Sequence, residues 1–135
     1  MTRIAYLDSS AIAKLVMPEP EHEILRAFLA SYPNRATSII GVIEVGRAVS
    51  RRDASHGRDL PDLWSRINVI PLDDRVAARA ASIDPPALRT LDAVHLATAL
   101  ELSTDLEVFV TYDMKLADAA TRQGLPVESP GGKPV

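Results

Sequence analysis

Apolar and polar residues follow one another along the chain in blocks that predict strands separated by helices. The apolar run Ile4–Leu7 is typical of a strand buried on both faces, and a second strand is expected at Leu106–Val110. Shorter strands are expected at 35–37, at 68–72 and around Val127, with Pro71 restricting the second of these to a sheet edge. Helical spacing and capping residues, among them Thr90, predict helices over 11–17, 21–30, 39–55, 60–66, 75–82, 91–102 and 114–122.

This regular alternation predicts an α/β fold with a central parallel sheet covered by helices on both faces. The 135 residues suit a single domain, which we expect over 1–128. The Pro- and Gly-rich end, 129–135, is expected to be a disordered tail. Sheets of this kind place their sites at the carboxyl ends of the strands, where the strand order reverses.

Composition narrows the function classes. The chain has no cysteine, which excludes disulfides, thiolate metal sites and thiol nucleophiles. The N-terminus does not read as a signal peptide, and no apolar stretch approaches the roughly 18 residues of a membrane helix, so a cytoplasmic protein is expected. The net charge of −3 and the 4% aromatic content mean that any nucleic acid must be held by a local basic patch and by metal.

Four carboxylates stand at positions that a parallel sheet would bring together. Asp8 and Asp113 each follow a predicted strand, and both would lie at the same edge of the sheet. Glu44 and Asp92 lie in early turns of predicted helices, each among apolar neighbours, where an unpaired charge is costly. Asp8, Asp92 and Asp113 alone are each better explained as a helix cap or a dipole partner, but the four acids together favour a metal site.

Such a group of oxygen ligands, without cysteine or a histidine cluster, indicates Mg²⁺, with Mn²⁺ able to substitute. The ion could activate water and stabilise the charge that develops on a phosphodiester. Ser10 could hold a water or a phosphate oxygen, and Arg47 and Arg51 follow Glu44 along one helix face, where phosphate contact and a solvated surface are equally supported. His95 is interpreted as a packed core residue, and Asp118 is left open.

The motifs resemble those of the PIN-domain nucleases. The segments 7–11, 91–99 and 110–116 look like the first, third and fourth acidic motifs of that family, and Glu44 stands where the second acid belongs. Length and motif order are similar to the VapC toxins of type II toxin–antitoxin pairs. The resemblance covers Ile4 to about Val127, nearly the whole chain.

The resemblance implies a three-layer α/β/α sandwich and a metal-dependent endoribonuclease. Carried over, it makes Asp8, Glu44, Asp92 and Asp113 the acidic site, with Asp8 and Asp92 as the most direct ligands and Ser10 and Thr111 as supporting hydroxyls. It further implies a homodimer and a hetero-oligomer with a VapB-type antitoxin. We expect that partner to place an Arg or Lys near the acids and to cover the apolar part of the first two helices, around Ile12, Leu15, Val16 and Leu25.

Three other interpretations compete. A non-catalytic PIN-like domain that binds nucleic acid or protein would need none of the four acids. A haloacid-dehalogenase-like phosphatase would need a second acid where Ser10 stands, and a receiver domain would need an acidic pair beside the first strand.

Overall fold

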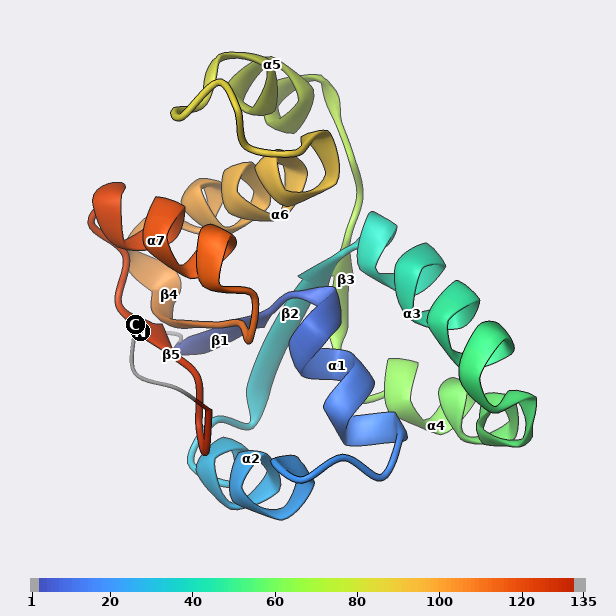
Figure 1. The fold of residues 1–135 in the computed structure, drawn as a ribbon. Coiled ribbons are helices and arrows are strands. Elements are labelled where there is room, and N and C mark those ends of the chain that lie inside the picture. Colours follow the sequence, from blue (N-terminus) through green and yellow to red (C-terminus); the bar gives the residue numbers. More distant parts are fainter. Residues whose placement is uncertain (1–2, 133–135) are drawn as a thin grey trace.

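The computed structural model describes residues 3–132, which form a five-stranded parallel sheet between two layers of helices (Figure 1). The strands are β1 (Ile4–Leu7), β2 (Asn34–Ser38), β3 (Asn68–Ile70), β4 (Leu106–Val110) and β5 (Val127–Glu128). The helices are α1 (Ser9–Val16), α2 (His22–Leu29), α3 (Ile39–Arg52), α4 (Leu60–Trp64), α5 (Asp74–Ser82), α6 (Thr90–Glu101) and α7 (Met114–Arg122). The predicted α/β fold is confirmed.

The strand order, β3-β2-β1-β4-β5, places the point of reversal between β1 and β4. The chain moves outward from β1 to β2 and β3, then returns across the sheet to β4 on the other side of β1. Leu7 lies opposite Val110 in the parallel register, so the two strands end side by side. Whatever follows these two strands therefore meets in one crevice at the carboxyl edge of the sheet.

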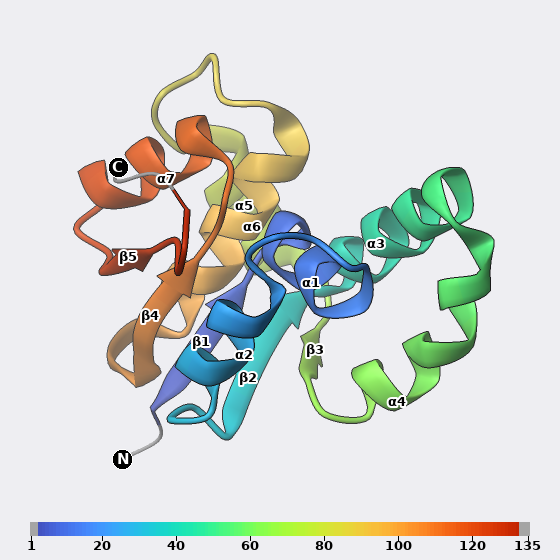
Figure 2. The same ribbon diagram turned by 60° about the horizontal axis from the view of Figure 1, so that its bottom comes forward.

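The alternation of side chains along β1 builds two separate cores. Ala5 and Leu7 pack against α1, α2 and α3 on one face, whereas Tyr6 packs against α6 and α7 on the other. Figure 2 shows α1 and α2 in front of the sheet, with α5 and α6 behind it. Because both faces of β1 are covered, its end is held in place from both sides.

Four of the helices begin with a side-chain cap. Asp8, Ser38, Asp73 and Asp113 each accept a hydrogen bond from a backbone N–H in the first turn of the following helix. The cap expected at Thr90 is wrong, because α6 begins at Thr90 itself, and its N-cap is Arg89, whose side chain makes no capping bond. The side chain of Arg89 is therefore available for another contact.

The expected disordered tail is wrong for its first four residues. The Oγ of Ser129 donates to the carbonyl of Thr111 at 2.5 Å, and the hydroxyl of Tyr112 donates to the carbonyl of Pro130 at 2.7 Å. Gly131, at a φ of 76°, lets the chain turn there. Polar groups beside β4 thus tie this segment down, and residues 133–135 lie outside the described part.

Within residues 3–132, no helix combines the length and the apolar character that crossing a bilayer requires. The cytoplasmic location stays a prediction.

Candidate active site

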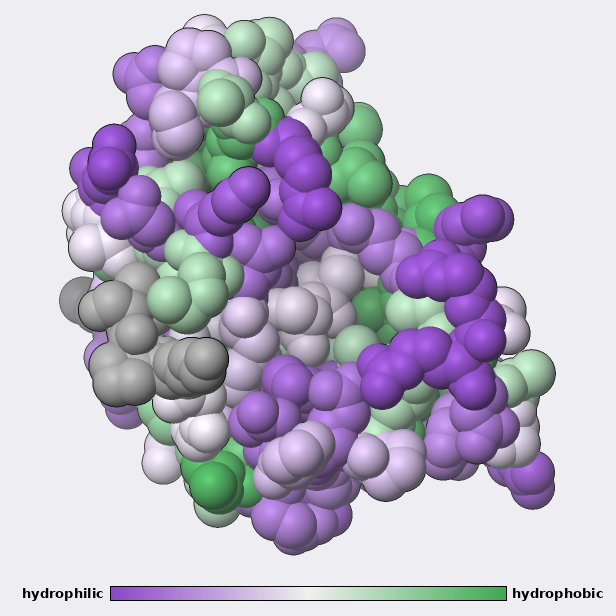
Figure 3. All heavy atoms as spheres, viewed as in Figure 1, coloured by the Kyte–Doolittle hydropathy of each residue, from purple (hydrophilic) through white to green (hydrophobic). Residues whose placement is uncertain are grey.

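All four predicted acids line one small pocket at the carboxyl edge of the sheet. Its volume is about 150 Å³, and it is lined by Asp8, Ser9, Ser10, Glu44, Arg89, Asp92, His95 and Asp113. Figure 3 shows a hollow in this face of the molecule, with hydrophilic side chains of α3 along one border. The parallel topology thus gathers carboxylates from β1, α3, α6 and the β4–α7 junction.

Asp8 is the most enclosed of the four acids, with a relative exposure of 3%. Its Oδ1 accepts from the Ser10 hydroxyl at 2.7 Å and from the Ala11 amide at 2.9 Å, and its Oδ2 accepts from the Thr111 hydroxyl at 2.6 Å. Burial raises the pKa of Asp8, although these hydrogen bonds and the proximity of His95 oppose the rise. The carboxyl group is therefore oriented firmly, but within residues 3–132 no Lys or Arg forms an ion pair with it.

Asp92 and Asp113 are bridged by an arginine that sequence reasoning did not single out. The Nε of Arg89 lies 3.1 Å from Oδ2 of Asp92, and one terminal nitrogen lies 3.0 Å from Oδ2 of Asp113. Burial raises the pKa of Asp92, and the charge of Asp113 adds to this while Arg89 opposes it. The sequence did contain a signal for the first of these contacts, because residues three positions apart at a helix start, such as Arg89 and Asp92, are neighbours on its surface.

Glu44 is held by a buried polar chain that runs into the core. Its Oε1 accepts from the Ser9 hydroxyl and lies 2.8 Å from Nε2 of His95. Burial alone would raise the pKa of Glu44, but the hydrogen bonds from His95 and Ser9 outweigh it and lower that pKa. His95 is a buried core residue, as expected, and it also orients a site carboxylate.

His95 connects the core residue Tyr6 to the pocket. The Tyr6 hydroxyl accepts from the Ser38 amide at 3.1 Å and lies 2.7 Å from Nδ1 of His95. The other ring nitrogen, Nε2, donates to the carboxylate of Glu44. The core residue Tyr6 thus determines, through His95, how Glu44 points into the pocket.

The change Tyr6→Phe is expected to destabilise the fold by about 1–3 kcal/mol, because it strands a buried imidazole nitrogen and a buried amide. Urea unfolding measures the effect. Tyr32→Phe is the matched control, since the Tyr32 hydroxyl makes no hydrogen bond to any described residue. Equal stability of the two variants would mean that the chain from Tyr6 to Glu44 does not contribute to folding.

The donor set of the pocket suits a hard divalent cation. Its candidate ligands are carboxylate and hydroxyl oxygens, which Mg²⁺ and Mn²⁺ prefer. The guanidinium of Arg89 already stands between two of the carboxylates as a substitute cation. Within the described residues, no three acidic or histidine side chains converge on one point as they stand.

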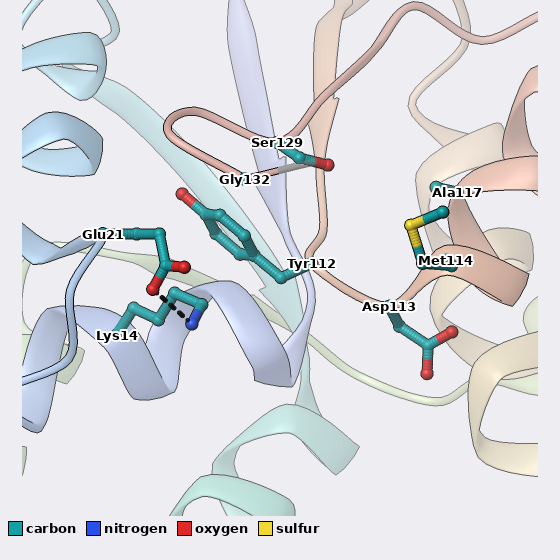
Figure 4. Close-up of a pocket in the computed structure, with 8 residues that line it drawn as sticks. All are labelled: Lys14, Glu21, Tyr112, Asp113, Met114, Ala117, Ser129 and Gly132. Atoms are coloured by element: carbon teal, nitrogen blue, oxygen red, sulfur yellow. Dashed lines mark hydrogen bonds and ion pairs between the residues drawn. The ribbon is translucent and has the colours of Figure 1, made fainter. Parts of the chain in front are cut away.

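A second hollow, of about 190 Å³, adjoins the acidic pocket and shares Asp113 with it (Figure 4). Its cation, Lys14, lies 2.9 Å from carboxylate oxygens of both Glu19 and Glu21 and 4.7 Å from the centroid of the Tyr112 ring. Two of the three ammonium hydrogens of Lys14 are thus engaged by glutamates, and its side chain is only 13% exposed. This hollow contributes no cation to the acidic site.

The remaining predicted residues lie away from the pocket. Arg47 and Arg51 are exposed on α3 and form no ion pair with any acid of the described chain, whereas Arg52 pairs with Glu19 at 2.7 Å. Asp118, which the sequence left open, pairs with Arg122 at 3.0 Å on α7 and does not line the pocket.

Comparisons with known proteins identify the family of this chain. The family model described as "PIN domain" matches residues 5–121. Ribonuclease VapC46 of Mycobacterium tuberculosis is 40% identical over 125 residues, covering 93% of this chain and 96% of the relative. Ribonuclease VapC47 of the same species is 37% identical over 134 residues, with the same coverage of both chains.

Among solved structures, a chain of a toxin–antitoxin complex from Klebsiella pneumoniae has a TM-score of 0.75 at 24% identity, covering 96% of this chain and 99% of that one. That likeness concerns the fold. The family match and the two relatives above 30% identity go further: this chain belongs to the PIN-domain family, among the proteins named VapC.

Proposed function

We propose that this chain is a divalent-metal-dependent endoribonuclease and the toxin of a pair with a VapB-type antitoxin. The observation that carries the proposal is the meeting of Asp8, Glu44, Asp92 and Asp113 in one pocket at the strand-order reversal. The name "Ribonuclease" of the relatives supports RNA as the substrate. Hydrolysis of its phosphodiester consumes one water molecule and breaks one P–O bond.

We propose Asp8, Asp92 and Asp113 as the residues that hold Mg²⁺, with Mn²⁺ as a substitute and with Glu44 completing the acidic wall. When bound, the cation supplies charge stabilisation for the phosphodiester and an activated water. The protein's own part is orientation. Ser10 and Thr111 donate to opposite oxygens of Asp8 and so keep its carboxylate turned toward the pocket.

Glu44 has a distinct part because His95 and Ser9 both donate to its Oε1. This leaves Oε2 as the oxygen available to the pocket. A carboxylate held in this way can accept a proton from an attacking water without a change of rotamer. The buried hydrogen bonds from Tyr6 to His95 and from His95 to Glu44 thus hold the Glu44 carboxylate in place, so that it need not move during the reaction.

Arg47 and Arg51 are proposed to contact RNA phosphates, because both are exposed and neither is neutralised by a described acid. Arg51→Ala should weaken RNA binding across sequences and lower the slope of log affinity against log salt by about 1. Arg52→Ala is the control, since Arg52 is already paired with Glu19. Identical slopes for Arg51→Ala and the unchanged protein would mean that Arg51 is an exposed charge that does not contact RNA.

The antitoxin is proposed to cover a groove between α1, α2 and α4. The toxin–antitoxin title of the Klebsiella pneumoniae structure supports a partner of this class. Two of the residues expected to form the contact are unsuitable, because Ile12 and Leu25 are fully buried in the core. Leu15 and Val16 are partly exposed and line a groove of about 490 Å³ with Leu63. The homodimer and the hetero-oligomer stay predictions.

Cleavage of RNA but not of DNA tests the function. The purified protein should cut a structured RNA at internal positions and leave a DNA of the same sequence intact, with fragments resolved by gel electrophoresis. The engagement of two acids by Arg89 favours a second candidate, a PIN-like domain that only binds. Binding of RNA without any cut in the presence of divalent metal would support that candidate instead.

A further inference from the structure

Arg89 is the cationic side chain that lines the acidic pocket, and its two hydrogen bonds join separate elements. Asp92 belongs to the first turn of α6, whereas Asp113 caps α7, 24 positions away from Arg89 in the sequence. Both bonds end on an Oδ2 atom, and the two distances, 3.1 and 3.0 Å, are nearly equal. The guanidinium therefore bridges the two carboxylates symmetrically.

We propose that Arg89 is an internal counter-cation that occupies the Asp92–Asp113 pair in the metal-free protein and must leave before a divalent ion binds there. This inference rests on the proposed function, since it concerns the ion that function requires. Two carboxylates facing one pocket repel each other, and Asp92 is largely buried, so the pair needs a positive charge. Arginine supplies that charge with a fork that reaches both groups.

Competition follows from the atoms involved. A hard cation would take carboxylate oxygens that point into the pocket, and the Oδ2 atoms of Asp92 and Asp113 are those that Arg89 now holds. Two cations cannot share these oxygens at close range without strong repulsion. Ion binding and the Arg89 bridge therefore exclude each other.

The side chain of Arg89 can leave its two ion pairs at a low cost in free energy. The Arg89 side chain is 73% exposed, so its ion pairs are screened by solvent and individually weak. It makes no capping bond to α6, so moving it away leaves the helix start intact. Lys14 offers a contrast nearby, because it is only 13% exposed and is tied to two glutamates. Of these two cations, Arg89 is the one that can swing out.

Mn²⁺ binding without RNA tests this inference, measured by the loss of the free-ion paramagnetic resonance signal. Arg89→Ala should bind Mn²⁺ about tenfold more tightly than the unchanged protein, the size expected from removing two ion pairs made by a solvent-exposed arginine. Arg89→Lys should fall between them, because an ammonium keeps the charge but lacks the fork. Arg122→Ala is the matched control, since it removes an arginine of similar exposure, 70%, from its ion pair with Asp118 outside the pocket.

The outcomes are separable. Equal Mn²⁺ affinity of Arg89→Ala and the unchanged protein would overturn the inference and leave the metal-dependent nuclease standing. Equal affinity of Arg89→Lys and the unchanged protein, with Arg89→Ala tighter, would reduce the effect to net charge and overturn the bridge. A lack of Mn²⁺ binding in every variant would defeat the proposed function itself.

A second measurement does not depend on any variant folding. In the unchanged protein, the Nε–H resonance of Arg89 should move toward that of a solvent-exposed arginine as Mg²⁺ is added. A resonance that stays in place while Mg²⁺ binds would show that the bridge persists beside the ion, and the inference would fail.

Discussion

Asp8→Asn is expected to lower RNA cleavage by at least about a hundredfold, because it removes a negative charge from the centre that we propose to hold the cation. The amide keeps the shape of the carboxyl group but is a much weaker ligand for a hard ion. Asp8 is also the acid with the most enclosed setting, held by Ser10 and Thr111, so no neighbouring side chain can move in to replace it.

The fold should survive this change. Asn is as good an N-cap as Asp, so the bond from the Ala11 amide is retained. Burial raises the pKa of Asp8, so its contribution to stability is present at low pH and is lost as the pH rises through that raised pKa. At neutral pH, the metal-free Asn variant should therefore be at least as stable as the unchanged protein in urea unfolding.

Asp73→Asn is the matched control for cleavage. Asp73 caps α5 with the same geometry, accepting from the Val76 amide at 2.9 Å, but it does not line the acidic pocket. It should leave cleavage unchanged. Near-normal cleavage by Asp8→Asn, with the fold intact, would mean that the reaction takes place elsewhere on the molecule.

The sheet and the acids could be predicted because their signals are local. A buried apolar run that ends in Asp8, and a strand followed closely by Asp113, predict two strand ends at one sheet edge once the order is parallel. Glu44 and Asp92 stand among apolar neighbours, which marks a charge that needs a partner. These features depend on few residues at short spacing, so a single sequence carries them.

The partners of these acids could not be predicted, since they come from distant parts of the chain. His95 meets Tyr6 across 89 positions and Glu44 across 51, and periodicity places it on an apolar helix face without indicating either contact. Arg89 meets Asp113 only because α6 and α7 lie on the same side of the sheet. The start of the tail, 129–132, was mispredicted for a similar reason. Its Pro- and Gly-rich composition does not indicate the hydrogen bonds that Ser129 and Pro130 make with groups beside β4.

Removal of divalent metal is expected to abolish cleavage completely. The acidic pocket holds four carboxylates and, within the described chain, one bridging arginine, so a phosphodiester that enters it without a divalent ion meets net negative charge. Burial raises the pKa values of Asp8 and Asp92, because it disfavours their charged forms. A cation of charge two reverses both effects.

The most direct measurement is therefore RNA cleavage by the purified protein after exhaustive chelation, followed by titration with Mg²⁺, Mn²⁺ or Ca²⁺. Cleavage should be absent after chelation and should return with Mg²⁺ or Mn²⁺ in the unchanged protein, but not in Asp8→Asn. Ca²⁺, which is larger and accepts looser geometry, should bind and restore little activity. Cleavage that persists at full rate in the chelated protein would contradict the assignment of this pocket as a metal-dependent ribonuclease centre.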